Sequence, residues 1–199
     1  MIPAALGIDV GIRNLSFCVL QKSKEGQFCI VDWQLIDVLQ LCGLDGSCDD
    51  LTSNEIHDIA RHALPLIFPT NFIQKYQIAH VGIEQQPHGK YGNQKIILFS
   101  HLLFEYFRSS LLNQHRGDTL QTVAFTGAAK KYDKQWLAMF KLSKPTTYIE
   151  RKQTSVRLCK LFCAKFQLSE LPKAALAKQD DLADAFLLAY IAWSHWLDC

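Results

Sequence analysis

The stretch QDDLADAFLLAYIAW, residues 179–193, constrains the fold more than any other part of the chain. Asp180, Asp181 and Asp184 open it, and an almost unbroken apolar run follows. A helix of this composition is apolar on most of its sides, so the rest of the chain must cover it. The negative charge gathered at its start requires a separate explanation.

The other apolar runs predict a sheet that this helix can cover. Three strands joined by short polar turns come first and predict an antiparallel meander; a helix, a strand, a helix, a strand and further helices follow. The fold class is therefore α/β, a mixed sheet with helices on its faces. Strands are expected at 4–10, 15–20, 28–38, 78–84 and 119–126, and helices from Thr52 to an end or kink near Pro65, at 94–112, at 150–166 and from about 180.

Composition indicates one ordinary globular domain over residues 1–199, with 49% apolar and 20% charged residues. No apolar run reaches the roughly 18 residues that span a bilayer, and no secretory leader is recognisable. We therefore expect a soluble intracellular protein without a membrane partner. The seven cysteines include no Cys-x-x-Cys pair, which favours reduced core thiols over a zinc site.

The small net charge of +2 conceals an uneven distribution. Residues 128–178 carry 12 Lys and Arg against 3 Asp and Glu, whereas residues 179–199 carry 4 Asp and Glu and neither Lys nor Arg. An enzyme that uses metal ions on a polyanion needs both kinds of charge, because cations hold phosphates while carboxylates hold the metal. A solvated basic face without a ligand explains the same charges, so this alternative stays open.

Carboxylates also stand at the ends of two predicted strands. Asp9 ends the first strand and Glu84 ends the fourth, each before a turn that contains Gly or Pro. If these strands are neighbours, the two side chains meet at one edge of the sheet, where the helix that begins near Asp180 can add more. Mg²⁺ takes oxygen ligands of this kind. Singly, Asp9 is also explained as a turn residue and Asp180 as a helix cap.

Four motifs carry a resemblance to a known family. The segments GIDVGIRNLSF (7–17), VGIEQQP (81–87), TYIERKQTSV (147–156) and KQDDLADAFLLA (178–189) resemble, in order, the motifs of RuvC-like Holliday junction resolvases. The nearest branch contains the resolvases of fungal mitochondria, poxviruses and other large DNA viruses. The resemblance spans essentially the whole chain. It implies an RNase H-like fold with a five-stranded mixed sheet flanked by helices, and an active homodimer.

The resemblance also implies an active site. Asp9, Glu84, Asp181 and Asp184 match the family's metal-binding carboxylates, which would hold two Mg²⁺ or Mn²⁺ ions. The implied reaction is hydrolysis of phosphodiester bonds in four-way junctions and related branched DNA, leaving 5′-phosphate and 3′-hydroxyl ends. By the same pattern Asp180 is left to cap the helix.

The basic and loop residues of the site are matched less closely. Lys152 is assigned to the family's catalytic basic residue, while Lys130 and Lys131 stay open as alternatives because they lie between the last strand and the following helix. The loop after Glu84, which contacts the junction centre in relatives, contains His88 and Tyr91 and departs from the bacterial form. Further phosphate contacts are expected from the basic stretch, at Lys130, Lys131, Lys134, Lys141, Lys144, Arg151 and Arg157.

Partner, location and function leave further alternatives. A two-fold dimer would supply paired cuts, and the apolar helix at 94–112 is the candidate interface, with burial in the monomer core as the other explanation. The resemblance places the protein in mitochondria if fungal, or at sites of viral DNA replication. GIDVGIRN also resembles the first phosphate loop of actin-like ATPases and sugar kinases, but 199 residues are too few for their two domains. A non-catalytic junction-binding module is the remaining alternative.

Overall fold

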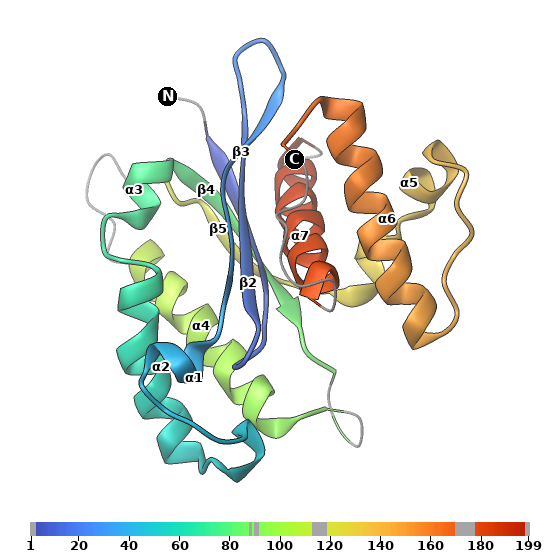
Figure 1. Cartoon of the computed structure of the whole chain (residues 1–199). Helices are drawn as coiled ribbons and strands as arrows, with labels where there is room; N and C mark the ends of the chain where they lie inside the picture. Colours follow the sequence, from blue (N-terminus) through green and yellow to red (C-terminus); the bar gives the residue numbers. More distant parts are fainter. Residues whose placement is uncertain (1–2, 88, 90–91, 113–118, 170–177, 198–199) are drawn as a thin grey trace.

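The computed structural model describes the chain except for residues 1–2, 88, 90–91, 113–118, 170–177 and 198–199. A mixed five-stranded sheet forms its centre, in the order β3-β2-β1-β4-β5 (Figure 1). The first three strands are antiparallel neighbours, while β4 runs parallel to β1 and β5 runs parallel to β4. The predicted architecture is confirmed. The strands are β1 (Ala4–Asp9), β2 (Leu15–Lys22), β3 (Phe28–Ile36), β4 (Ile78–Gln85) and β5 (Thr122–Gly127).

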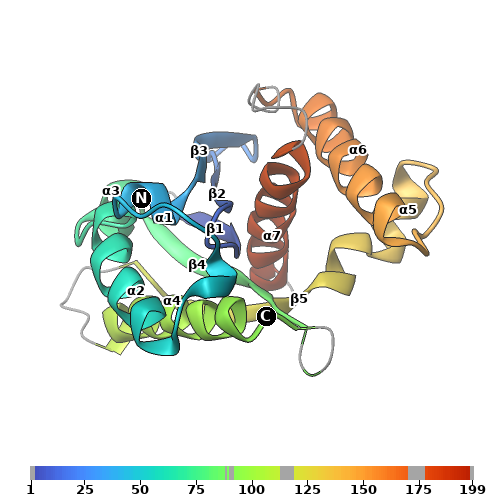
Figure 2. The ribbon, with the colours of Figure 1, turned by 60° about the horizontal axis from the view of Figure 1, so that its bottom comes forward.

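Helices cover both faces of this sheet. Helices α2 and α4 pack on one face and α7 on the other, with α6 outside α7 (Figures 1 and 2). Within the described residues, none of the helices combines the length and apolarity that crossing a membrane requires. The helices are α1 (Val38–Leu41), η1 (Cys48–Asp50), α2 (Ser53–Ile67), α3 (Phe72–Tyr76), α4 (Gln94–Leu112), η3 (Ala128–Tyr132), α5 (Lys134–Met139), α6 (Tyr148–Phe166) and α7 (Gln179–Leu197).

The boundaries follow local chemistry. The predicted Thr52 and Glu55 capping box is present, but α2 continues through Pro65 to Ile67, two residues beyond the expected end or kink. Strand β3 ends at Ile36, not 38, because the side chain of Asp37 accepts a hydrogen bond from the Gln40 N–H and caps α1. Strand β5 begins three residues later than the expected position 119.

Alternation along the strands assigns each side chain to one face. On β1, Leu6 and Ile8 enter the core beneath α2 and α4, so Gly7 and Asp9 point toward α7. On β4, Ile83 enters the same core, so Glu84 also faces α7. The face that carries both strand-end carboxylates is therefore the one that the acidic helix covers.

Helix α7 approaches the sheet closely because glycines lie beneath it. A Cβ atom built on Gly7 would stand only 2.1 Å from the Ala189 nitrogen and 2.2 Å from the Ala185 oxygen. Two hydrogen bonds then fix the first turn: Ser16 Oγ donates to the Asp181 carbonyl at 2.6 Å, and Trp33 Nε1 donates to the Leu182 carbonyl at 3.0 Å. The position of the acidic residues along the sheet is thereby set.

Candidate active site

Three carboxylates converge at the ends of β1 and β4 and the start of α7. Ile8 pairs with Ile83 in the parallel register, which brings Asp9 beside Glu84. Asp184 comes from the second turn of α7, and one oxygen from each of the three carboxylates lies within 4.8 Å of the others. We name Asp9, Glu84 and Asp184 the acidic triad.

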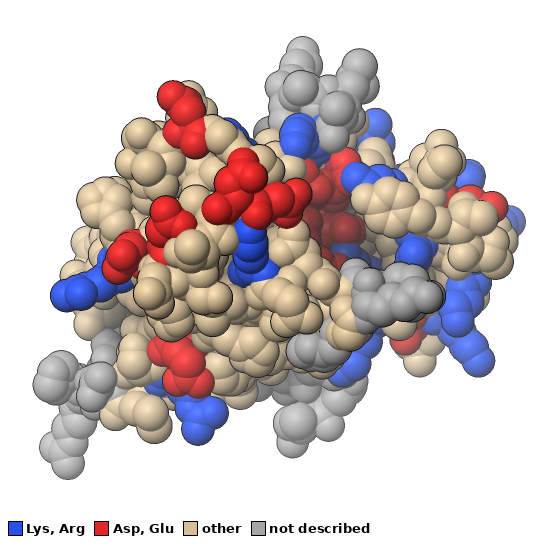
Figure 3. Space-filling model, turned by 90° about the horizontal axis from the view of Figure 1, so that it is seen from below, with Lys and Arg blue, Asp and Glu red and all other residues tan. Residues whose placement is uncertain are grey.

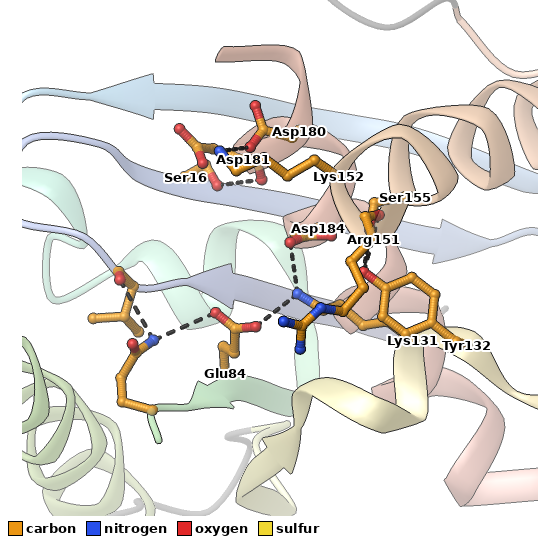
Figure 4. Close-up of polar contacts among 12 residues, drawn as sticks. Ser16, Glu84, Lys131, Tyr132, Arg151, Lys152, Ser155, Asp180, Asp181 and Asp184 are labelled. Atoms are coloured by element: carbon orange, nitrogen blue, oxygen red, sulfur yellow. Dashed lines mark hydrogen bonds and ion pairs between the residues drawn. The ribbon is translucent and has the colours of Figure 1, made fainter. Parts of the chain in front are cut away.

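A lysine completes the cluster. Lys131 lies on η3, directly after β5, and its Nζ is 2.6 Å from Glu84 Oε1 and 2.6 Å from Asp184 Oδ2 (Figure 4). Its side chain is 3% exposed. On the other side, Gln86 Nε2 donates to Glu84 Oε2 at 3.3 Å and to the Val10 carbonyl at 3.5 Å, which orients that carboxylate.

Burial and neighbouring charges shift the pKa values of the three triad carboxyl groups in different directions. Burial raises the pKa of Asp9 well above its usual range, and Glu84 adds to the effect. Burial also raises the pKa of Asp184 against the opposing charge of Lys131. For Glu84 the effect of burial is outweighed by a hydrogen bond with Asp9 and by Lys131, so its pKa is lowered. Asp9 therefore retains its proton most readily, while Glu84 ionises first.

The chemistry of the triad fits a hard divalent cation. All three side chains offer oxygen atoms, the ligands that Mg²⁺ and Mn²⁺ prefer. Oδ1 of Asp184 is buried and accepts no hydrogen bond from the described residues. Leaving a buried acceptor without a donor costs free energy, and a bound cation would offset that cost. The residues present are those that such a site needs.

The other predicted site residues lie apart from the triad. Asp181 precedes Asp184 by three residues on α7. Burial raises the pKa of Asp181 to about 6, and the charge of Asp180 adds to the effect. The assigned catalytic lysine, Lys152, pairs at 2.5 Å with Asp180 and lies over the Tyr148 ring at 5.2 Å. The cap expected at Asp180 is wrong, because α7 begins at Gln179 and the Asp180 side chain bonds to Lys152 instead.

The predicted phosphate contacts divide in two. Lys131 is buried at the triad rather than on the surface, because η3 turns its side chain toward the carboxylates. The remaining six, Lys130, Lys134, Lys141, Lys144, Arg151 and Arg157, are exposed. Figure 3 shows acidic residues in a hollow, with lysines and arginines on several sides of it and further acidic residues on another side. His88 and Tyr91 lie outside the described residues.

Sequence reasoning missed a groove beside the site. Between α6 and α7 lies a depression of about 580 Å³, whose basic lining comes from Lys152, Arg157 and Lys160, with Asp180 at one side. Arg157 and Lys160 are three residues apart and therefore lie on the same face of α6. Helical periodicity could have added Lys160 to the predicted phosphate contacts, because Arg157 was already among them.

Comparison with known proteins identifies the fold. No protein-family model matches the chain, and no curated protein matches it in sequence. Among solved structures, the yeast mitochondrial Holliday junction resolvase Ydc2 matches over 98% of this chain and 83% of its own, with 18% identity and a TM-score of 0.65.

RuvC of Thermus thermophilus in complex with a Holliday junction substrate matches over 98% of this chain and 96% of its own, with 15% identity and a TM-score of 0.56. The chain has the RuvC-like resolvase fold. A second structure of the same bacterial RuvC agrees, at 17% identity and a TM-score of 0.55. The resolvase fold predicted from four short motifs is therefore confirmed.

Proposed function

We propose that this chain is a metal-dependent endonuclease that resolves four-way junctions and related branched DNA. The observation that carries the proposal is the acidic triad, which stands at the end of β1, the end of β4 and the start of α7 in a fold shared with Holliday junction resolvases. The basic residues around the hollow support a polyanionic substrate.

The residues of the triad have distinct parts in the proposed reaction. Asp9 must release its retained proton before it can bind a cation, whereas Glu84 is already ionised and is oriented by Gln86. When bound, Mg²⁺ or Mn²⁺ activates water and stabilises the leaving oxygen, commonly as a pair of ions. Water adds to phosphorus as the bond to the 3′ oxygen breaks, which gives 5′-phosphate and 3′-hydroxyl ends.

The DNA is proposed to approach across the hollow and along α6. Exposed Lys130, Lys134 and Arg151 belong to η3, α5 and α6, and Arg157 and Lys160 line the groove between α6 and α7. Phosphate contacts of this kind position DNA without reading its sequence. This surface is therefore proposed to bind the DNA backbone and not to read base sequence.

A homodimer is proposed for paired cutting. The inner face of α4, formed by Ile97, Phe99, Leu103 and Phe107, is buried in the monomer core, while Leu98 and Leu102 are only half-buried. Light scattering at micromolar concentration should give twice the monomer mass. A monomer that cuts junctions at full rate would contradict the dimer but leave the proposed chemistry intact.

The decisive experiment compares a synthetic four-way junction with a linear duplex of the same sequence. With Mg²⁺ or Mn²⁺ the chain should cut the junction, and Asp9→Asn and Asp184→Asn should bind it without cutting. A chain that binds but never cuts would be a junction-binding module, and equal cutting of both DNAs would remove structure selectivity.

Variants at the start of α7 test the fourth carboxylate. Asp181→Asn is expected to abolish cleavage while junction binding persists, because it removes negative charge near the phosphate. Asp180→Asn should retain most activity, since Asp180 pairs with Lys152 outside the triad. An inactive Asp180→Asn together with an active Asp181→Asn would assign the metal-binding role to Asp180 instead of Asp181.

A further inference from the structure

The position of Lys131 has a consequence for the cation that the triad binds. Its ammonium contacts Glu84 Oε1 and Asp184 Oδ2 at 2.6 Å each. The segment that carries it is held from both sides: β5 precedes it, and the next residue, Tyr132, donates from its hydroxyl to the Arg151 carbonyl at 3.1 Å and contacts Ser155 Oγ at 2.9 Å. The ammonium is therefore placed by the fold and not by a freely moving loop.

A lysine and a divalent cation cannot share these oxygens at the same time. Mg²⁺ binds oxygen at about 2.0 to 2.1 Å. A cation bound to the same two oxygens would stand almost where the ammonium stands, and two positive charges that close repel strongly at low solvent exposure. One of them must leave.

We propose that Lys131 is a resident counterion of the acidic triad, which a divalent cation must displace from Glu84 and Asp184 in order to bind. Lys131 is thus a positioning residue: it keeps the buried carboxylates together and lowers the affinity of the triad for metal. The proposal rests on the metal-dependent function proposed above.

A competing explanation makes the contact a permanent ion pair. In that case the ammonium stays in place, and the cation binds through oxygens that the ammonium does not contact, such as those of Asp9. The two explanations differ in the exposure of the Lys131 amine when metal is added, which can be measured without any DNA or cleavage.

Pulse labelling of the wild-type protein with an amine-reactive ester distinguishes them. Peptide mass spectrometry should find Lys131 labelled slowly in chelator and several-fold faster with saturating Mn²⁺, while exposed Lys24, in the turn after β2, is labelled equally in both. Unchanged protection of Lys131, in a protein that calorimetry shows to bind Mn²⁺, would overturn the displacement. A wild-type protein that binds no Mn²⁺ would overturn both this inference and the proposed metal dependence.

The variant Lys131→Met provides a second measurement. Without an ammonium to displace, it should bind Mn²⁺ about tenfold or more tightly than the wild type, and Mn²⁺ should raise its melting temperature by a larger increment. Lys24→Met removes the same charge from a distant exposed turn and should leave Mn²⁺ affinity within about twofold. Equal or weaker Mn²⁺ binding by a folded Lys131→Met would contradict the proposal, and the labelling result stands even if that variant does not fold.

Discussion

The close packing of α7 on β1 makes Gly7→Ala the sharpest test of how the fold supports the site. The added methyl would lie 2.1 Å from the Ala189 nitrogen, whereas ordinary contacts begin at 3.4 Å. The atom that it meets belongs to the helix backbone, so no side chain can turn aside. Helix α7 must therefore retreat from the sheet by about 1.3 Å, the difference between the two distances.

Two magnitudes follow from that retreat. Overpacking a core costs about 1 to 3 kcal/mol, and a backbone clash belongs at the upper end, so the free energy of unfolding should fall by about 3 kcal/mol. Asp184 moves with α7 away from Asp9 and Glu84, and a misplacement of about 1 Å can cost roughly 100-fold in rate. Urea denaturation followed by circular dichroism and single-turnover junction cleavage measure the two effects.

Gly82→Ala is the matched control, because Gly82 lies under the same helix with more room. Its methyl would meet the Leu188 oxygen at 3.1 Å and the Ala192 Cβ at 3.2 Å, so a shift of a few tenths of an ångström suffices. We expect a loss of about 1 kcal/mol or less and cleavage within a few-fold of wild type. Wild-type stability and cleavage in Gly7→Ala would refute the reasoning.

Three further outcomes are expected. Asp181 has a pKa of about 6 in the fold against 3.8 in the unfolded chain. Well below pH 3.8 the group is protonated in both states and does not affect stability, whereas above about pH 6 it is ionised in both states and destabilises the fold in full. Because Asp181 is partly exposed, we discount the stability effect of its pKa shift for screening by solvent. Asp181→Asn should then add about 1 to 2 kcal/mol to the free energy of unfolding at pH 8 and roughly half of that gain at pH 5, as measured by urea denaturation. Because burial and Glu84 raise the pKa of Asp9, calorimetry should show tighter Mn²⁺ binding at pH 8 than at pH 6, with proton release. Lys130→Ala with Lys134→Ala should flatten the log–log salt dependence of junction binding by about 2, and an unchanged slope would show that neither contacts a phosphate.

The sheet and the meeting of Asp9 with Glu84 were predictable from sequence for a physical reason. Strand-end residues of adjacent parallel strands share one edge of a sheet, and alternation puts both on the face that an apolar helix must cover. The acidic start of α7 could then be placed near them. These inferences need only periodicity and chain order, which the sequence contains.

The burial of Lys131 beside the acidic triad was not predictable in the same way. Lys130, Lys131 and Lys152 all follow β5, and neither charge nor family order distinguishes an exposed lysine from a buried one. The short η3 decides it by turning Lys131 inward beside buried Tyr132, and five residues of 3₁₀ helix are too few for a readable period. Similarly, the sequence does not distinguish adjacent Asp180 and Asp181, and only the fold shows that Asp180 pairs with Lys152.

The spacing of the triad along the chain also orders events during synthesis. Asp9 and Glu84 are 75 residues apart, and Asp184 follows after another 100. Chains emerge from the ribosome with the N-terminal part first, so both strand carboxylates exist long before α7 can dock. Until then the glycine-containing face of β1 and β4 lacks its helix, and the triad lacks its third member. The candidate site therefore becomes complete only as a late step of folding, because a chain that has not yet made α7 lacks Asp184.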